Sequence, residues 1–245
     1  MNAGGSSRAR EGGARRLGIV VQARLGSTRL ARKALLPLGG ATLLDMVLAR
    51  LALVEADIRV LATEPSSAGE LAPLARRHGF ELFVGPEEDV LGRYCMAIRE
   101  FGLDRVIRAT GDNPLVCHEA ANILIASREG RESDYASQVG LPLGMGVESV
   151  AAGALLLAEK EARDAYEREH VCPHLYNNPG RFSIDRPEAP PEYRFPEGRV
   201  TVDTLRDYEF VRGLYGAYYD GSPIPSARIL GAIRERSTAG GPEAA

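Results

Sequence analysis

The stretch LGIVVQARLGSTRLARK, residues 17–33, joins the pattern of a buried strand to a strongly basic loop. Its first seven residues are mostly apolar and β-branched, which is typical of a strand covered on both faces of a sheet. The loop then contains a Gly-Ser-Thr turn, no acidic residue and four cations, Arg24, Arg29, Arg32 and Lys33. A basic turn directly after a buried strand indicates a phosphate site, and a solvated basic loop is the alternative.

The segments after this loop alternate between strand-like and helix-like patterns. Apolar runs predict strands, and apolar faces with a period of 3.6 residues predict helices. Thr42 is the expected N-cap of the first helix, with Asp45 as its capping-box partner. Such alternation with short loops predicts an α/β fold with a mainly parallel sheet. The expected strands cover 58–63, 80–85 and 104–111, and the expected helices cover 41–54, 67–79, 89–101 and 118–130.

The second half of the chain is less regular but predicts the completion of the same sheet. Residues 133–150 indicate a strand, a Gly/Pro loop and a further strand. We expect helices over 151–164, 165–178 (interrupted by Pro173) and 204–219, and short strands over 181–184 and 198–203. Together these patterns indicate one domain over 17–236, with flexible segments at 1–16 and 237–245, where the composition is rich in Gly and polar residues.

Composition limits which kinds of partner the protein could bind and which cell compartment is expected. Lys and Arg number 30 against 33 Asp and Glu, with a pI near 5.9, which argues against nucleic acid or an anionic membrane as the main partner. No apolar run approaches the eighteen or so residues of a membrane span. The three cysteines, Cys95, Cys117 and Cys172, form no CxxC pair. A cytoplasmic protein without structural disulfides is therefore expected.

Two carboxylates follow other expected strands. Asp112 lies in RATGDNPL (108–115), and Asp203 ends the predicted strand before the last long helix. Each could instead cap the next helix. In open parallel sheets the loops at the carboxyl ends of the strands carry the ligand site. Two carboxylates beside a polyphosphate commonly hold Mg²⁺, which we therefore expect as the cofactor.

Four motifs in order resemble one protein family. They are QARLGSTRL followed by Lys33, then RATGDNPL, REHVCPHLYNNP (168–179) and VTVDTLRDYEFV (200–211). Together they resemble the cytidylyltransferase family of the spore-coat polysaccharide protein SpsF, which is related to the acylneuraminate and KDO cytidylyltransferases. The similarity runs from about residue 17 to residue 219. It implies a GT-A-like, Rossmann-like nucleotidyltransferase sheet with helices on both faces.

The resemblance also implies roles for single residues. A cytidylyltransferase binds CTP and a small sugar-like acceptor, and the acceptor oxygen attacks the α-phosphate with release of pyrophosphate. The implied catalytic residues are Arg29, Lys33 and Asp112, and the implied Mg²⁺ ligands are Asp112 and Asp203. Implied nucleotide-binding residues are Ala23, Arg24, Ser27, Arg29, Lys33, Ala62 and Thr63; implied acceptor-binding residues are Glu148, Arg168 and His170.

The chain departs from the family pattern at two places. Ala31-Arg32 replaces a common Pro-Gly before the lysine, and Gly146 replaces an aspartate that often stands two residues before Glu148. Either Glu148 or His170 could deprotonate the acceptor, and an acidic acceptor would need no base. The sequence therefore does not identify the acceptor or the base that would deprotonate it.

Several alternatives accompany this hypothesis. A nucleotide-sugar glycosyltransferase could share the fold, although the chain lacks the DxD metal motif usual in that class. A non-catalytic nucleotide-binding protein is the third class. His170, Cys172 and His174 suggest zinc only weakly, because no paired CxxC accompanies them. Cys95 reads as a buried apolar residue, and the tyrosines at 215, 218 and 219 read as packing residues, with a homodimer interface as the alternative.

Overall fold

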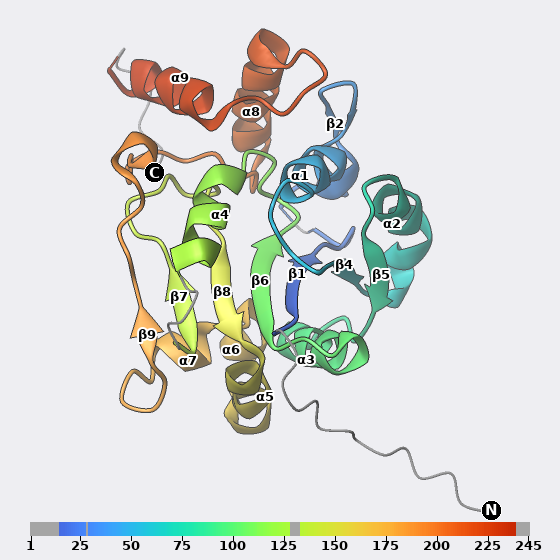
Figure 1. The fold of residues 1–245 in the computed structure, drawn as a ribbon. Helices are drawn as coiled ribbons and strands as arrows, with labels where there is room; N and C mark the ends of the chain where they lie inside the picture. The colour runs from blue at the N-terminus through green and yellow to red at the C-terminus, as the bar shows by residue number, and fades with distance from the viewer. Residues whose placement is uncertain (1–14, 28, 128–132, 239–245) are drawn as a thin grey trace, which may run out of the picture.

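A computed structural model describes residues 15–27, 29–127 and 133–238. Its centre is a seven-stranded sheet in the order β5-β4-β1-β6-β8-β7-β9 (Figure 1). Only β8 runs antiparallel to its neighbours within this sheet, so the predicted mainly parallel α/β sheet is confirmed. The strands are β1 (Leu17–Gln22), β4 (Ile58–Thr63), β5 (Glu81–Val84), β6 (Arg105–Thr110), β7 (Tyr135–Ser137), β8 (Glu148–Ala151) and β9 (Ile184–Asp185).

Helices cover both faces of the sheet. Alternate residues of β1 point to opposite sides: Ile19 and Val21 belong to one apolar cluster and Val20 to the other. Residues of α1, α2, α4, α8 and α9 pack in the first cluster, and residues of α3, α5 and α7 in the second. The helices are α1 (Leu43–Leu51), α2 (Pro65–Arg77), α3 (Val90–Phe101), α4 (His118–Ser127), α5 (Ala152–Glu161), α6 (Ala165–His170), α7 (Pro173–Tyr176), α8 (Leu205–Tyr218) and α9 (Ser226–Thr238).

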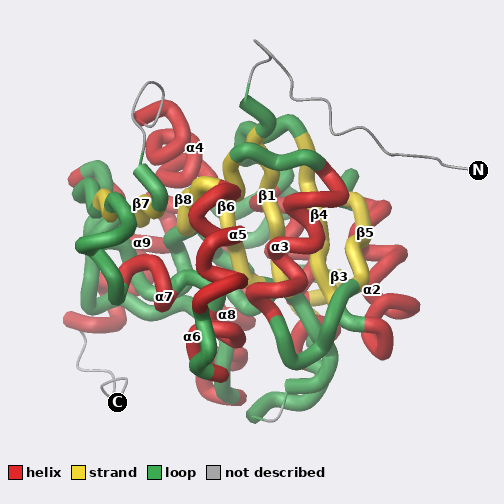
Figure 2. Tube along the Cα trace, turned by 90° about the horizontal axis from the view of Figure 1, so that it is seen from below, coloured by secondary structure: helices red, strands yellow, loops and turns green. Residues whose placement is uncertain are grey.

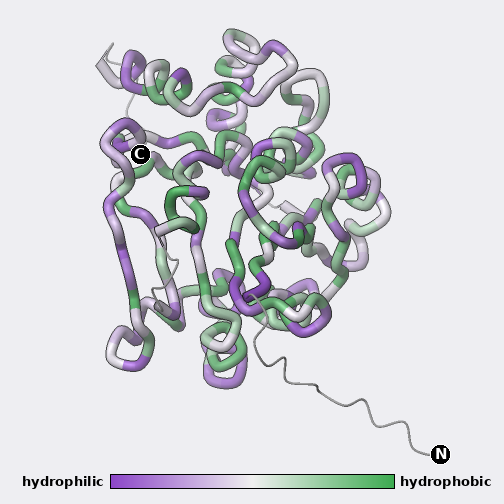
Figure 3. Tube along the Cα trace, in the orientation of Figure 1, coloured by the Kyte–Doolittle hydropathy of each residue, from purple (hydrophilic) through white to green (hydrophobic). Residues whose placement is uncertain are grey.

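The views agree with this layering. In Figure 2, α3 and α5 lie across the strands on one face of the sheet. In Figure 3 the central strands are coloured as hydrophobic and the outer turns mostly as hydrophilic. A small hairpin, β2 (Pro37–Leu38) with β3 (Ala41–Thr42), and two 3₁₀ turns, η1 (Lys33–Leu35) and η2 (Pro191–Tyr193), complete the described structure. In the part of the chain that the structure describes, no helix has the length and apolar character to cross a membrane.

Helix caps follow the sequence closely. The predicted capping box at the start of α1 is confirmed, because Thr42 accepts from the N–H of Asp45 and Asp45 accepts from the N–H of Thr42. Asp89 caps α3, which begins where the apolar pattern predicts. Helix α2 starts at Pro65, two residues earlier than expected, because the carboxylate of Glu64 caps it.

The predicted strand over 198–203 is wrong. The segment makes one isolated bridge, between Leu143 and Arg199, and otherwise runs as irregular chain. Its backbone N–H groups bond to loops instead of a strand: Val200 donates to the carbonyl of Leu143 at 2.8 Å, and Val202 to that of Asp112 at 2.9 Å. The alternating apolar pattern reflects the burial of Val200 and Val202. It does not show which groups accept the backbone hydrogen bonds, and here these are loop carbonyls and not a neighbouring strand.

The expected helix over 165–178 is two short helices. The break lies at Val171, whose φ of 73° is in the left-handed region that β-branched residues rarely adopt, and Pro173 opens α7. Helix α9 was not expected, and it extends to Thr238, into the segment predicted as a tail. Residues 1–14 and 239–245 of the expected flexible ends lie outside the described residues. Tyr215 of α8 is buried and donates to the carbonyl of Pro114, which supports its packing role.

Candidate nucleotide-binding site

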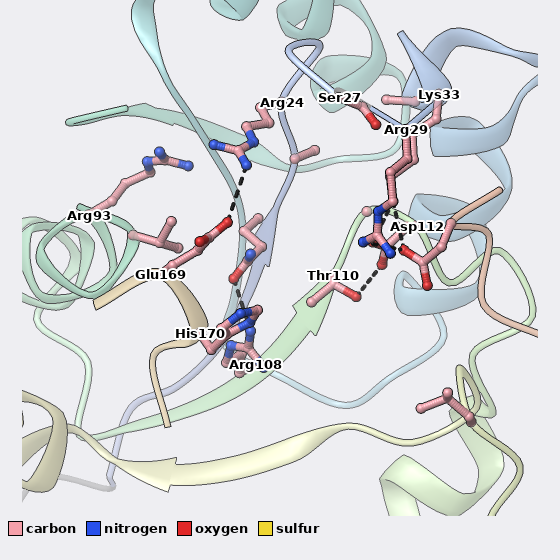
Figure 4. Close-up of a pocket in the computed structure, with 17 residues that line it drawn as sticks. Arg24, Ser27, Arg29, Lys33, Arg93, Arg108, Thr110, Asp112, Glu169 and His170 are labelled. Atoms are coloured by element: carbon pink, nitrogen blue, oxygen red, sulfur yellow. Dashed lines mark hydrogen bonds and ion pairs between the residues drawn. The ribbon is translucent and has the colours of Figure 1, made fainter. Parts of the chain in front are cut away.

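A cavity of about 560 Å³ lies at the carboxyl ends of β1 and β6. This is the position at which open parallel sheets bind their ligands. Figure 4 shows its labelled side chains in two groups, with Ser27, Arg29, Lys33 and Asp112 on one side and Arg24, Arg93, Glu169 and His170 on the other. Its charged lining consists of the cations Arg24, Arg29, Lys33, Arg93 and Arg108 and the carboxylates Asp112, Glu169 and Asp203.

A close approach between two loops fixes Asp112. The N–H of Gly111 donates to the carbonyl of Gln22 at 2.8 Å. A Cβ atom at Gly111 would lie 2.8 Å from the Cβ of Ala23, so only glycine fits there without displacing the end of β1. Asp112 therefore follows β6 directly beside the basic loop. Its Oδ1 accepts from the hydroxyl of Thr110 at 2.6 Å.

Lys33 connects the two predicted metal ligands. Its Nζ donates to Oδ2 of Asp112 at 2.9 Å, to Oδ1 of Asp203 at 3.3 Å and to the carbonyl of Val202 at 3.0 Å. The three side chains come from 3₁₀ turn η1, the loop after β6 and the segment before α8. The structure therefore brings together the predicted set Lys33, Asp112 and Asp203 at one point of the cavity.

The structure also decides against the capping alternative for both aspartates. Thr204, not Asp203, caps α8 and forms a capping box with Asp207. Helix α4 begins at His118, six residues beyond Asp112. Asp203 is instead held among cations, with Arg199 at 2.8 Å and Arg29 at 3.5 Å. Burial alone would raise the pKa of the neighbouring Asp207, but hydrogen bonds from Arg199 and from the backbone N–H groups of Asp203 and Thr204 lower this pKa overall.

The basic loop divides into residues that line the cavity and one that does not. Arg24, Ser27, Arg29 and Lys33 line it, whereas Arg32 is exposed and pairs with Glu70 outside it. The backbone of Arg32 has φ 51° and ψ 33°, the left-handed conformation that glycine adopts without steric cost. This explains the glycine that the resembled family commonly carries at this position. Thr28 lies outside the described residues.

Arg108 forms the wall between this cavity and a second one of about 330 Å³. It pairs with the carboxylate of Glu148 and donates to Oε1 of Gln22 at 3.2 Å. The phenol of Tyr135 donates to Glu148 at 2.7 Å. Burial alone would lower the pKa of Arg108, but the facing carboxylate of Glu148 raises it overall. Burial, together with Glu148, raises the pKa of Tyr135, so both groups stay protonated at neutral pH.

Not every predicted residue reaches the first cavity. Glu148 lines the second cavity together with Gly146, and His170 lines the first. Ala62 and Thr63 are fully buried at the end of β4 and line neither cavity. Arg168 also lines neither: its guanidinium bonds to the carboxylate of Asp89 and to the carbonyl of Glu159, which ties α6 to α3 and α5.

Sequence reasoning missed several lining residues. Arg108 carried a usable signal, since it is a charged residue inside an otherwise apolar strand, where a cation needs a partner. Arg93 lies within α3 and is almost fully buried, with its guanidinium bonded to the carbonyls of Pro86 and Glu87. Glu169, which pairs with Arg24 at 3.4 Å, stands between two residues that the sequence did single out.

The donor set of the site fits a hard divalent cation. Asp112 and Asp203 present carboxylate oxygens to one shared cation, the Lys33 ammonium, so a positive charge is already accommodated between them. Carboxylate oxygen is the ligand that Mg²⁺ prefers, with phosphate oxygens and water completing its shell. The zinc alternative has no such geometry: Cys172 is fully buried, His174 bonds to Glu167 and Glu161, and no cluster of three or more His, Cys, Asp or Glu among the described residues could hold a metal.

Comparisons with known proteins agree with this geometry. The model of the family described as Cytidylyltransferase matches residues 18–225. The chain is 35% identical over 219 residues to the spore coat polysaccharide biosynthesis protein SpsF of Bacillus subtilis, covering 86% of this chain and 91% of that protein.

Solved structures show the same fold. A cytidylyltransferase from Leptospira borgpetersenii superposes with a TM-score of 0.84 and 25% identity, over 92% of this chain and 96% of that one. The CMP:2-keto-3-deoxy-manno-octonic acid synthetase, solved with CTP, superposes with a TM-score of 0.65 and 17% identity, over 82% of this chain and 99% of that one. The Rossmann-like nucleotidyltransferase fold expected from the sequence is confirmed.

Proposed function

The chain belongs to the cytidylyltransferase family, and we propose that it transfers CMP from CTP to a sugar or related acceptor and releases pyrophosphate. One observation carries this proposal: Lys33, Asp112 and Asp203 meet at one point of a cavity whose basic wall comes from the loop after β1. A role in surface polysaccharide or glycoconjugate synthesis is supported by the similarity to SpsF over most of both chains.

The cations of the cavity account for binding of the triphosphate. Arg29 and Lys33 lie on one side of it and Arg24 on the other, and the Arg29 side chain is largely exposed although it pairs with Asp203. Guanidinium forks and an ammonium bind phosphate oxygens with charge-assisted hydrogen bonds. Ser27 adds a hydroxyl and a turn of backbone beside them. We propose that these four residues hold the triphosphate from both sides, with its α-phosphate toward the second cavity.

Asp112 and Asp203 would hold Mg²⁺. When bound, the ion supplies charge neutralisation for the phosphate oxygens. The chain's own residues do the rest: Lys33 and Arg29 stabilise the negative charge that develops on the leaving pyrophosphate, and Thr110 orients Asp112 through its 2.6 Å hydrogen bond. Transfer of this kind depends on positioning and charge more than on covalent help from the protein.

The nucleoside part of CTP would lie on the other side of the cavity, where Val90 and Arg93 form the wall. Because Ala62 and Thr63 are buried, a contact of these residues with the base or ribose would require the chain to move. The carbonyl of Ala62 already accepts from the N–H of Ala23 at 3.2 Å.

The proposal is tested by two measurements. Binding of each NTP in the presence of Mg²⁺ is measured by calorimetry, and pyrophosphate release is assayed with CTP and a panel of sugars. We expect CTP to bind and at least one sugar to give CTP-dependent release. No binding of CTP, together with no release with any acceptor, would overturn the proposal.

Two variants place the chemistry at the cavity. Asp112→Asn should abolish turnover supported by Mg²⁺ while the circular dichroism spectrum stays that of the parent. Glu209→Gln, an exposed carboxylate on α8 outside both cavities, is the matched control and should keep full turnover. Full activity of Asp112→Asn would remove Asp112 from the site.

A further inference from the structure

The second cavity, of about 330 Å³, opens directly beside the first. Arg108, Thr110 and Leu143 line both, so a ligand in the second cavity would lie next to the proposed α-phosphate position. Strands β6, β7 and β8 and the Gly/Pro loop between β7 and β8 form its wall. The acceptor of a transfer reaction has to occupy such a neighbouring space, and the chemistry of the lining therefore restricts what the acceptor is.

The two charged groups of this cavity neutralise each other. Among its lining residues only Arg108 and Glu148 carry charge, and they form an ion pair. Tyr135 donates to the other oxygen of Glu148 at 2.7 Å, and the second terminal nitrogen of Arg108 donates to Gln22. The fork of Arg108 that could hold a carboxylate is thus already engaged. Its Nε has no partner among the described residues, and each terminal nitrogen keeps one further N–H, but both terminal nitrogens are already held by Glu148 and Gln22.

Asn113, which lines the same cavity, has a side-chain acceptor without a partner among the described residues. Thr110 gives its hydroxyl proton to Asp112 at 2.6 Å, so the oxygen of Thr110 can only accept from Asn113 at 2.9 Å. That bond requires the NH₂ group of Asn113 to face Thr110, which leaves Oδ1 as a pure acceptor. Oδ1 is buried and has no partner among the residues that the structure describes. A buried acceptor without a partner favours a ligand that donates hydrogen bonds.

We propose that the part of the acceptor held in the second cavity is an uncharged, hydroxyl-rich sugar or polyol. This inference rests on the proposed cytidylyl transfer and narrows its substrate class. Hydroxyl groups donate to Oδ1 of Asn113 and to the remaining lone pairs of Glu148. A carboxylate in the same place would face the carboxylate of Glu148 and leave the Asn113 oxygen unpaired.

The transfer step balances with such an acceptor. A hydroxyl oxygen forms the new bond to the α-phosphorus of CTP as the bond from that phosphorus to the bridging oxygen of the β-phosphate breaks. The hydroxyl proton leaves to solvent, and pyrophosphate carries away the electron pair. No oxidant or further co-reactant is required.

Matched pairs of probes test the inference. Glucose is compared with glucuronate, galactose with galacturonate, and glucitol with gluconate, each with enzyme, CTP and Mg²⁺. Binding to the CTP-loaded enzyme is measured by saturation-transfer NMR, and pyrophosphate release is measured in parallel. We expect binding of neutral members to exceed that of their acidic partners at least tenfold. Preference for the acidic members, or no binding by any neutral member, would overturn the inference.

The same experiment separates the two proposals. CTP binding is measured first, without acceptor. If CTP binds and acidic sugars are preferred, the substrate class is wrong and cytidylyl transfer stands. If CTP does not bind, cytidylyl transfer fails and the inference that rests on it fails as well.

A variant provides an independent readout. Glu148→Gln keeps the shape of the side chain, removes the negative charge and releases the fork of Arg108. We expect the ratio of acidic to neutral binding to rise at least tenfold, measured on enzyme saturated with CTP, with the fold checked by circular dichroism. Glu188→Gln, whose carboxylate pairs with Arg194 outside both cavities, is the control and should leave the ratio unchanged. An unchanged ratio in folded Glu148→Gln would contradict the inference.

Discussion

The Nζ atom of Lys33 lies 2.9 Å from Oδ2 of Asp112, although the two residues are 79 positions apart in the chain. The ammonium also contacts Asp203, so one cation joins the basic loop to both carboxylates. In this arrangement the site is partly self-neutralised, and a triphosphate would compete with the two aspartates for Lys33. Mg²⁺ on the two aspartates would release Lys33 to the triphosphate, so we expect nucleotide affinity in the presence of Mg²⁺ to depend on Lys33.

Replacing Lys33 by Met should weaken CTP binding about tenfold to hundredfold, the loss expected for one charge-assisted hydrogen bond to phosphate. The measurement is calorimetric titration with CTP in the presence of Mg²⁺. Arg32→Met is the matched control, because Arg32 is adjacent in sequence but pairs with Glu70 outside the cavity. Equal losses of affinity in both variants would show that the loop acts only through its total charge.

Arg32 provides a separate test of the backbone. Arg32→Gly and Arg32→Ala both remove the ion pair with Glu70, but only glycine adopts the observed φ of 51° without steric cost. We expect the Gly variant to melt about 2–4 °C above the Ala variant, as measured by differential scanning calorimetry. An Ala variant that melts at the same temperature or higher would mean that the left-handed conformation is not held in solution.

The sequence predicts the elements that depend on local contacts or on a periodic apolar pattern. Strands β1, β4 and β6 follow from apolar runs, and the cap of α1 follows from Thr42. The anion site followed from rules about parallel sheets, because loops at the carboxyl ends of strands meet at one edge. Placing Asp203 beside Asp112 needed only that Asp203 lie at the same edge, whether or not a strand precedes it.

Other features depend on contacts between distant segments that no local pattern records. The segment 198–203 bonds to the loops at Leu143 and Asp112, and it was therefore mistaken for a strand. Arg168 precedes two cavity residues, Glu169 and His170, yet bonds to Asp89, the N-cap residue of α3, and lines neither cavity. A short helix places neighbouring side chains on different sides, so proximity in sequence could not separate them.

Arg50 should be essential for attaching the C-terminal part of the chain. Its buried guanidinium donates to the carbonyls of Val116 (2.6 Å) and Ile224 (2.5 Å) and to the hydroxyl of Ser226 (3.0 Å). Arg50→Met would remove the donor from both carbonyls and from the Ser226 hydroxyl in a buried place, and we expect the unfolding free energy to fall by about 3–5 kcal/mol in urea denaturation.

The control for this variant is Arg99→Met. Arg99 pairs with Glu159 while half exposed, and removing it should cost less than about 1 kcal/mol. An equal loss of unfolding free energy in the two variants would show that burial does not make the Arg50 hydrogen bonds more stabilising than an exposed ion pair.

Asp45 should contribute stability that depends on pH. Burial alone would raise its pKa, but hydrogen bonds from His78 and Thr42 and the charge of Arg77 lower the pKa from 3.8 to about 2. A lowered folded-state pKa stabilises the fold above the unfolded value, and the contribution is lost as pH falls from about 4 to 2. We therefore expect the difference in unfolding free energy between the parent and Asp45→Asn to shrink by about 2 kcal/mol over that interval. Urea denaturation at pH 7, 4, 3 and 2 measures this difference, with Glu209→Gln as an exposed control. A difference that stays constant across these pH values would show that the bonds to His78 and Thr42 do not favour the charged form of Asp45.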